Sequence, residues 1–288
     1  MGWLAAQIVL ALLGGALSGR GPVRKALGLT MAVASCLCAL ANPSDSIKLK
    51  AFQALAGPWV VMQNIRIART QPPLPIRVWQ SISTYDVTKV VRVKPAISTR
   101  LVLRATLFWA ITAACLYVVF YVAPTSSAPG FMRWAFGVVG IYATADAIAT
   151  CLVASHRLIG LEVPKIHDNP LLARSIMEFW GRRWNLIVGQ WLHEYCYRPL
   201  AARRHPFAGV VASFAASAFL HWYLIFVPLG LSHSLVMTAF FLIQIPLIAI
   251  ERKLRLATKP SWAANLWTIG SLVLISGLFV DPFLRLLS

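Results

Sequence analysis

The sequence predicts an all-α polytopic membrane protein with about eight transmembrane helices. Hydrophobic residues make up 58% of the 288 residues and charged residues only 12%, which is about half the charged share of a typical soluble domain. The basic residues also gather in alternate connecting segments rather than evenly along the chain. Because no internal repeat or second hydrophilic domain interrupts the pattern, we expect residues 1–288 to form a single integral-membrane domain.

Eight apolar stretches are the candidates for these helices, because a spanning helix needs about 20 mainly apolar residues. The first three are short, so the pattern is compatible with seven to nine spans. The stretches are 3–17, 27–41, 51–65, 103–122, 132–153, 207–227, 235–250 and 262–280.

The net charge of +18 follows the positive-inside pattern rather than that of a nucleic-acid-binding protein. Segments 18–26, 65–104, 154–206 and 251–260 hold 23 of the 27 Lys and Arg residues, and the segments between them hold four. Such an asymmetry places the basic segments in the cytosol. We therefore expect a multi-pass protein in the lipid bilayer, with its long loops in the cytosol, both termini on the other side and no nucleic-acid partner.

Small residues crowd the end of the first apolar stretch, where Gly14, Gly15 and Gly19 occur. In membrane proteins such residues allow two helices to approach closely. No Gly-Lys-Ser/Thr sequence follows them, so a phosphate-binding loop of that kind is not indicated. These glycines therefore predict close helix packing.

The basic loop 66–100 is interrupted by Pro72, Pro73 and Pro75, which prevent a regular helix at that point. Two interpretations remain open for the rest of the loop. It is either a cytosolic linker whose charge fixes the topology, or residues Ile76 to Val93 form an amphipathic helix on the anionic leaflet.

A single carboxylate, Asp146, lies within the stretch 132–153. A charge inside a span is costly and marks a functional candidate that faces the protein interior. The structural alternative is a hydrogen bond to Thr144 or Thr150, or an ion pair with a nearby arginine. The sequence leaves both readings open.

The segment from Glu178 to Arg198 reads EFWGRRWNLIVGQWLHEYCYR. Taken as one helix, it predicts an aromatic face at the membrane interface and a polar face for chemistry. The aromatic face would carry Trp180, Trp184, Ile187, Val188, Trp191 and Tyr195. The polar face would carry Arg182, Asn185, Gly189 and His193.

His221 is the isolated ionisable residue of the stretch 207–227, fourteen residues after Phe207. A neutral imidazole with a pKa near 6.5 is suited to moving a proton at neutral pH. The alternative is a histidine that only makes an interhelical hydrogen bond. Because Trp222 and Tyr223 follow it, further hydrogen-bond donors adjoin the ring.

The block Phe-Trp-Gly-Arg-Arg-Trp-Asn at 179–185, followed by His221 in an apolar stretch, resembles the membrane-bound O-acyltransferase superfamily. The likeness is to its wax synthase-like branch and covers roughly residues 168–224. Many relatives carry an acidic residue after this histidine, whereas Trp222 follows it here. What orients the imidazole is therefore left open.

The resemblance implies helices around an intramembrane reaction tunnel and acyl transfer from coenzyme A to a hydrophobic alcohol. His221 would be the general base, and Asn185 would hold the thioester or its developing oxyanion. Acyl-CoA would be a co-substrate, without a permanently bound cofactor or metal. The residues expected to bind coenzyme A or substrate are Arg174, Trp180, Arg182, Arg183 and Trp184.

A polytopic transporter and a non-catalytic membrane subunit are the alternatives to an enzyme. A transporter predicts several intramembrane charges or paired broken helices, and the stretches contain one clear charge, Asp146. A non-catalytic subunit leaves the block at 179–185 without a role. The sequence does not identify the alcohol, the acyl chain length or the oligomeric state.

Overall fold

The computed structural model describes residues 2–256 and 259–288. The chain forms two compact units. The first contains the chain up to Val90 together with Phe219–Leu235, and the second contains Val91–Ala218 and Val236–Ser288. The single acyltransferase domain expected from the sequence stays a prediction.

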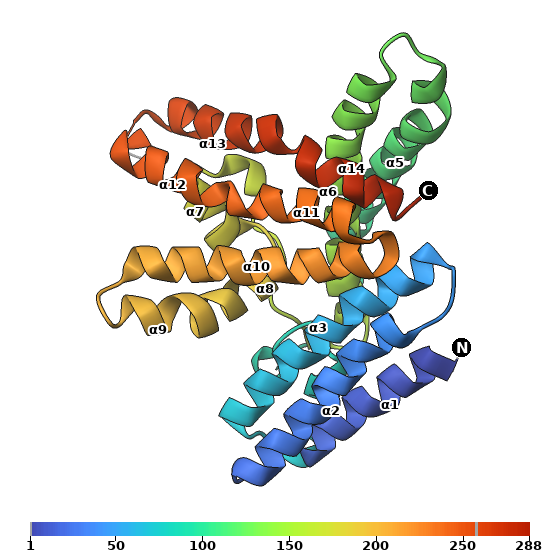
Figure 1. The fold of residues 1–288 in the computed structure, drawn as a ribbon, viewed down its shortest axis with the longest axis vertical. Coiled ribbons are helices and arrows are strands. Elements are labelled where there is room, and N and C mark those ends of the chain that lie inside the picture. Colours follow the sequence, from blue (N-terminus) through green and yellow to red (C-terminus); the bar gives the residue numbers. More distant parts are fainter. Residues whose placement is uncertain (1, 257–258) are drawn as a thin grey trace. The chain divides into compact units, whose positions relative to one another are not determined.

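The first unit is built on three long helices and a short one. α2 (Pro22–Ala41) packs against both α1 (Gly2–Leu17) and α3 (Ile47–Thr70), and the three run side by side (Figure 1). The short helix α4 (Leu74–Ile82) packs on α1 and α3, and a 3-10 turn, η1 (Val87–Lys89), follows it.

Small residues bring these helices close together, as the sequence predicts. A β-carbon added at Gly15 would lie 2.7 Å from the carbonyl oxygen of Arg77 in α4. One added at Gly57 would lie 2.8 Å from the Cα of Cys36 in α2. Any larger side chain at either position would force the backbones apart, so the prediction of close helix packing is confirmed for α1.

Buried amides hold the interior of this unit together. Gln7 Nε2 donates to the carbonyl of Gln53 at 2.9 Å, and Gln80 Nε2 donates to Gln63 Oε1 at 2.6 Å. In an apolar interior an unpaired amide is costly, so these pairs fix how α1, α3 and α4 meet.

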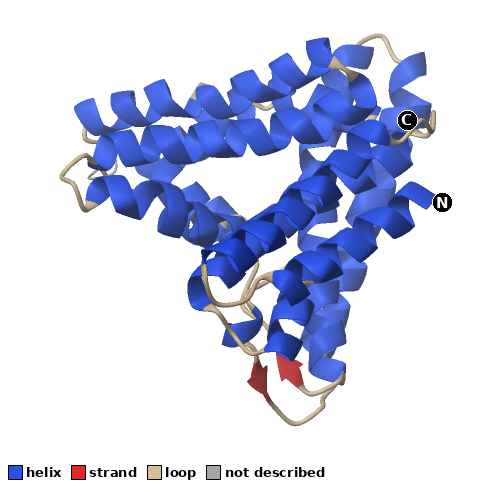
Figure 2. Cartoon of the chain, turned by 60° about the horizontal axis from the view of Figure 1, so that its bottom comes forward, coloured by secondary structure: helices blue, strands red, loops and turns tan. Residues whose placement is uncertain are grey.

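The second unit begins with a short antiparallel strand pair, β1 (Val91–Arg92) and β2 (Leu161–Glu162), drawn red in Figure 2. In the sequence between these two strands lie α5 (Thr99–Tyr117) and α6 (Pro129–Leu158), which pack along each other. α5 continues through the π-helical η2 (Val118–Val122) and the 3-10 turn η3 (Ala123–Thr125). The strands have two residues each, and helices make up most of the rest of the described chain.

The C-terminal helices complete the second unit. They are α12 (Gln244–Lys253), α13 (Ser261–Ile275) and α14 (Gly277–Arg285). Val280 and Leu284 of α14 form a buried cluster with Val119 and with Ile141 of α6. Two further helices contribute to both units, α10 (Pro206–Leu229) and α11 (Leu231–Leu242).

All eight apolar stretches lie in helical regions, and the prediction of an all-α polytopic membrane protein is confirmed at that level. Among the described residues, five helical segments are long and apolar enough to cross a membrane, and α13 with α14, bent by 46°, makes a sixth if it is one span. α1 is apolar but has 16 residues, about 24 Å at 1.5 Å per residue, against a hydrocarbon core of about 30 Å. The count of eight spans stays a prediction.

The prediction of one helix across Glu178–Arg198 is wrong. Trp184 is extended (φ −101°, ψ 131°) and Asn185 is left-handed (φ 43°, ψ 57°), so the chain turns a corner between two helical pieces. Asparagine tolerates this conformation better than most residues. The proposed aromatic arc therefore does not exist as one face. The pieces are α7 (Ile176–Glu178), η5 (Phe179–Arg183), α8 (Leu186–Leu192), η6 (His193–Tyr197) and α9 (Arg198–Ala201).

Of the two interpretations left open for this loop, the helix over Ile76–Val93 forms only in its first part, and its contact with the leaflet stays a prediction. α4 ends at Ile82, and a loop with the turn η1 follows it. Pro73 precedes the helix, and its missing N–H costs no hydrogen bond, because the N–H groups at a helix start have no partner within the helix.

Candidate functional site

The first helical piece of the motif begins at a doubly capped N-terminus. Ser175 Oγ accepts the backbone N–H of Glu178 at 2.9 Å, and Glu251 Oε2, from α12, accepts the N–H of Ile176 at 2.9 Å. Two of the backbone donors that a helix start leaves free are thus satisfied. Glu251 is buried, so α12 fixes where the motif starts.

Glu178 and Arg183 tie the two ends of this piece together. Glu178 Oε1 accepts Arg183 Nε at 2.7 Å, while its Oε2 accepts the backbone N–H of Arg174 at 2.8 Å. Arg183 Nη1 also donates to the carbonyls of Asp168 and Asn169 at 3.2 and 3.3 Å. The Arg183 guanidinium is therefore engaged in holding the preceding loop.

The protonation of Glu178 follows from these contacts. Burial by itself would raise the pKa of this carboxyl group, but the backbone hydrogen bond from Arg174 and the pairing with Arg183 outweigh it and lower the pKa. Glu178 is therefore ionised at neutral pH and supplies the charge that Arg183 needs.

Trp180 lies in an aromatic cluster of the second unit. Its ring meets those of Phe214, Phe240 and Phe241 with centroids 6.4, 6.2 and 5.8 Å apart. Its Nε1 donates to Gln244 Oε1 at 3.3 Å. These contacts orient the indole among helices and leave its polar atom with a partner.

Trp184 lies in a second aromatic group. Its ring stacks on Phe179 at 5.8 Å and on Tyr142 of α6 at 5.7 Å, and it contacts the His167 ring at 4.5 Å. The side chain thus joins the motif to α6 and to the loop before η4 (Pro170–Leu172).

The corner at Asn185 is held by backbone pairing with that loop. The N–H of Asn185 donates to His167 Nδ1 at 3.1 Å, and the N–H of Leu186 donates to the carbonyl of Ile166 at 2.8 Å. The N–H of Asp168 donates to the carbonyl of Arg183 at 2.8 Å. Three hydrogen bonds therefore fix the backbone that carries Asn185.

The Asn185 side chain has its oxygen engaged more than its nitrogen. Oδ1 accepts the N–H of Val188 at 3.5 Å and caps α8. Among the described residues, Nδ2 has no hydrogen-bond partner, and the residue is half-buried. An amide N–H₂ held on a fixed corner can donate to an oxygen that carries developing negative charge.

His167 is neutral in this setting. Burial lowers the pKa of its imidazole, and the nearby Arg104 acts in the same direction, against opposing effects of Asp146 and a hydrogen bond with the backbone of Ala145. Because Nδ1 accepts the Asn185 N–H, the ring proton belongs on Nε2.

Asp146 is paired with an arginine, one of the two readings left open by the sequence. Arg104 Nε and Nη2 donate to Asp146 Oδ1 and Oδ2 at 2.8 and 2.7 Å, and Thr150 Oγ1 donates to Oδ1 at 3.3 Å. Thr144 instead donates to the carbonyl of Gly140. This bidentate ion pair joins α5 to α6 and offsets the charge of a carboxylate that is only 2% exposed.

His221 is half-buried in the part of α10 that belongs to the first unit. It lies fifteen residues after the helix start at Pro206, about 22 Å along the axis at 1.5 Å per residue. Of its neighbours, Tyr223 donates to the carbonyl of Cys36 at 2.5 Å, and the ring of Trp222 stacks on that of Phe226 with centroids 4.6 Å apart. Asn185 belongs to the second unit, and its meeting with His221 stays a prediction.

Arg174 and Arg182 are exposed. In the described part of the chain neither has a carboxylate within ion-pair distance of its side chain. This distinguishes them from Arg183, although the sequence groups all three. His193, the remaining polar candidate, stacks on Tyr197 with centroids 5.2 Å apart.

Sequence reasoning missed the supporting residues His167, Glu178, Glu251 and Arg104. Each acts on a partner that is distant in sequence or on the backbone, and the side-chain pattern of the motif gives no signal for this. Only the run of polar residues around Asp168 and Asn169, next to His167, marks the loop as more than a linker.

Residues 163–243 match the family described as membrane-bound O-acyl transferase. A probable long-chain-alcohol O-fatty-acyltransferase 2 of Arabidopsis thaliana is 29% identical over 173 residues, covering 54% of this chain and 50% of that protein. A probable long-chain-alcohol O-fatty-acyltransferase 3 of the same plant is 32% identical over 147 residues, covering 44% and 42%.

The long-chain-alcohol O-fatty-acyltransferase of Simmondsia chinensis is 28% identical over 159 residues, covering 49% of this chain and 44% of that protein. The chain thus spans about half the length of the curated relatives it matches. These comparisons confirm the resemblance to wax synthase-like membrane-bound O-acyltransferases, and the matched segment contains the corner at Asn185 and also His221.

Proposed function

On the premise that residues 163–243 are similar to the membrane-bound O-acyl transferase family, we propose that this protein transfers an acyl group from coenzyme A to a lipophilic alcohol. One observation carries the proposal: the motif forms a rigid corner that presents the unpartnered Nδ2 of Asn185. A scaffold protein gains nothing from such a corner, whereas an acyl transfer needs a fixed donor for its oxyanion.

His221 is the proposed general base. Its imidazole takes the hydroxyl proton of the alcohol while the alcohol oxygen attacks the thioester carbonyl. The tetrahedral intermediate then collapses, the carbon–sulfur bond breaks, and the imidazolium returns the proton to the coenzyme A thiolate. The histidine ends neutral, and an ester and a free thiol leave. Support comes from the position of the ring in an apolar helix, half-buried.

Asn185 is the proposed donor to the thioester oxygen. A donor on a preorganised backbone strengthens its hydrogen bond as charge develops, and removal of one such donor typically costs about 10²–10³ in rate. The hydrogen bond from the backbone N–H of Asn185 to His167 fixes the corner, and the one from the Val188 N–H to Oδ1 orients the side-chain amide.

Coenzyme A would meet the exposed guanidinium groups of Arg174 and Arg182. Both are exposed in a segment that we expect in the cytosol from its charge, and guanidinium forks suit phosphate groups. Arg183, Trp180 and Trp184 were expected in the same group, but their contacts support a positioning role.

A fatty alcohol is the first acceptor to test, because the relatives from Arabidopsis thaliana and Simmondsia chinensis are both described as long-chain-alcohol O-fatty-acyltransferases. Sterols and the hydroxyls of terpenoids or polyketides are the other members of the panel. The same comparisons do not favour the transporter or the non-catalytic subunit considered from the sequence.

The decisive experiment is ester formation by membranes that contain the protein. Labelled acetyl-CoA and palmitoyl-CoA are supplied in turn with each alcohol, for the wild type and for His221→Ala. His233→Ala is the matched control, since His233 is another half-buried histidine of the first unit. We expect ester from the wild type and the control, and none from His221→Ala at equal membrane levels. Full activity of His221→Ala contradicts the proposed base.

A further inference from the structure

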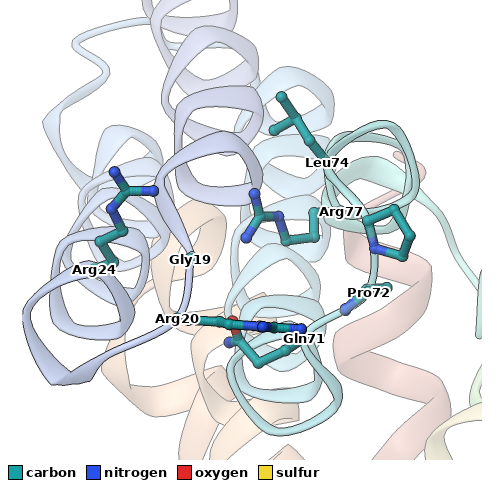
Figure 3. Close-up of a pocket in the computed structure, with 8 residues that line it drawn as sticks. Gly19, Arg20, Arg24, Gln71, Pro72, Leu74 and Arg77 are labelled. Carbon is teal, nitrogen blue, oxygen red and sulfur yellow. The ribbon is translucent and has the colours of Figure 1, made fainter.

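A basic pocket of about 440 Å³ opens in the first unit, and its lining includes no residue of the proposed catalytic site. It lies between the α1–α2 turn and the α3–α4 turn, and Figure 3 shows the side chains that line it. Its lining includes Gly19, Arg20, Arg24, Gln71, Leu74 and Arg77. The volume falls in the range of small-molecule sites.

Three arginines line this pocket without a countercharge among the described residues. Arg24 and Arg77 extend on either side of Gly19 (Figure 3). A β-carbon at Gly19 would lie 3.2 Å from Arg24 Nη1 and 3.5 Å from Arg77 Nη1, so both arginines reach the same point. No carboxylate of the described residues lies within 4.0 Å of the nitrogens of Arg20, Arg24 or Arg77. Like charges this close favour a bound anion.

Arg77 also has hydrogen-bonding capacity to spare. Its Nη1 donates to the carbonyl of Ser18 at 2.9 Å, which fixes the side chain. Its Nε is buried and has no hydrogen-bond partner among the described residues. A buried guanidinium N–H without a partner is costly. No carboxylate of the described residues offsets the charge of Arg77, and guanidinium groups bind phosphate oxygens.

The surface beside the pocket is apolar although it is exposed. On α4, Leu74 and Ile82 are 51% and 53% exposed, whereas Gln80 and Ser81 are buried. On α2, Val23 is 71% exposed and adjoins Arg24. Exposed apolar side chains beside basic residues are suited to contact with lipid at a membrane surface.

We propose that this pocket binds an anionic phospholipid, with the phosphate between Arg24 and Arg77 and the acyl chains along Leu74 and Ile82. The basic segments 18–26 and 65–104 that form it are on the side assigned to the cytosol by charge, where anionic lipids are abundant. A soluble phosphate or coenzyme A would use the arginines but not the apolar face. The bound lipid would join α2 to α4 at the membrane surface.

The test is lipid binding by the whole purified protein after delipidation in a mild detergent. Native mass spectrometry measures the affinity for dioleoyl phosphatidylglycerol, with dioleoyl phosphatidylcholine, glycerol 3-phosphate and coenzyme A as the other probes. The variants are Arg24→Gln, Arg77→Gln and Leu74→Gln. Lys25→Gln is the matched control, because it removes the same charge from the next position of α2 and does not line the pocket.

We expect the affinity for phosphatidylglycerol to fall by about tenfold or more in each arginine variant and to stay unchanged in Lys25→Gln. Leu74→Gln should also weaken its binding. Arg77→Gln tests the site only if its thermal midpoint is kept, since Arg77 holds Ser18. If the midpoint falls, Arg24→Gln carries the test alone. Equal binding to Arg24→Gln and the wild type overturns the proposal. So does glycerol 3-phosphate or coenzyme A binding as tightly as the lipid, or phosphatidylcholine binding as tightly as phosphatidylglycerol.

Discussion

The backbone N–H of Asn185 donates to Nδ1 of His167 at 3.1 Å, so a histidine 18 positions earlier holds the proposed oxyanion donor in place. Asn185 needs this help because its left-handed backbone (φ 43°) is unfavourable for most residues. The pair separates two roles of Asn185, a backbone role at the corner and a side-chain role in chemistry.

Replacement of Asn185 by glycine distinguishes these two roles. Glycine adopts the left-handed conformation without strain and keeps the N–H that His167 accepts, but it lacks Nδ2. We expect Asn185→Gly to fold with a thermal midpoint close to that of the wild type and to lose about 10²–10³ in kcat. Ester formation and thermal unfolding of the same preparation check this. If kcat survives, the amide has no part in the chemistry.

His167→Ala should destabilise the backbone corner at Asn185 without changing Asn185 itself. It leaves the Asn185 N–H without its acceptor, which costs about 1–3 kcal/mol when the group is buried, and it opens space beside Trp184. We expect a lower thermal midpoint and a lower kcat with little change in KM for the acyl-CoA. His167→Asn, whose Oδ1 can replace Nδ1 as the acceptor, should recover part of both. Equal loss in the two variants would show that the hydrogen bond is unimportant.

The lowered pKa of His167 predicts a pH dependence of stability. The native state disfavours the imidazolium, so the unfolded state takes up the proton first as the pH falls below about 6.5. The contribution of His167 to stability is therefore present above this pH and is lost as the pH falls toward the lower native pKa. Thermal midpoints from pH 8 to pH 5 should decline less steeply for His167→Asn than for the wild type. Parallel plots of thermal midpoint against pH for the two proteins would contradict a lowered pKa of His167.

The Arg104–Asp146 pair should matter to stability more than its surface counterpart. Asp146→Asn leaves Arg104 without its carboxylate, and breaking a buried pair typically costs about 3–5 kcal/mol. Because the Arg104 side chain is 36% exposed, we expect the lower end of this range. Asp281→Asn, which breaks the exposed pair with Arg285, is the control and should cost about 0–1 kcal/mol. Denaturant unfolding in detergent compares the two, and equal costs would be evidence against a structural role for Asp146.

Arg182 and Arg183 are adjacent, but their replacement by glutamine should have different effects on activity and stability. Arg182→Gln removes an exposed, unpaired guanidinium, so we expect a raised KM for palmitoyl-CoA and an unchanged thermal midpoint. Arg183→Gln breaks the contacts to Glu178 and to the carbonyls of the loop, so we expect a lower midpoint and lower kcat. Steady-state kinetics and thermal unfolding give both readings. If both variants change only KM, Arg183 binds substrate and is not a positioning residue.

The sequence by itself determined the helical membrane class and the location of the motif. Apolar length and charge asymmetry are local quantities, and a bilayer acts on each stretch separately. For the same reason the eight stretches appear as helical regions, although their number as spans stays a prediction. The small residues at Gly14 and Gly15 also predict close packing correctly, because the absence of a side chain is itself local information.

Only the tertiary structure decided what the motif residues do. The corner at Asn185 depends on His167 and Ile166, and the surroundings of Trp180 come from residues some 60 positions later. Arginines that look alike in sequence separate into Arg183, which is engaged, and Arg182, which is exposed. The physical reason is that a hydrogen bond or ring contact acts over a few ångströms of space, and the helix packing decides which distant residues come that near.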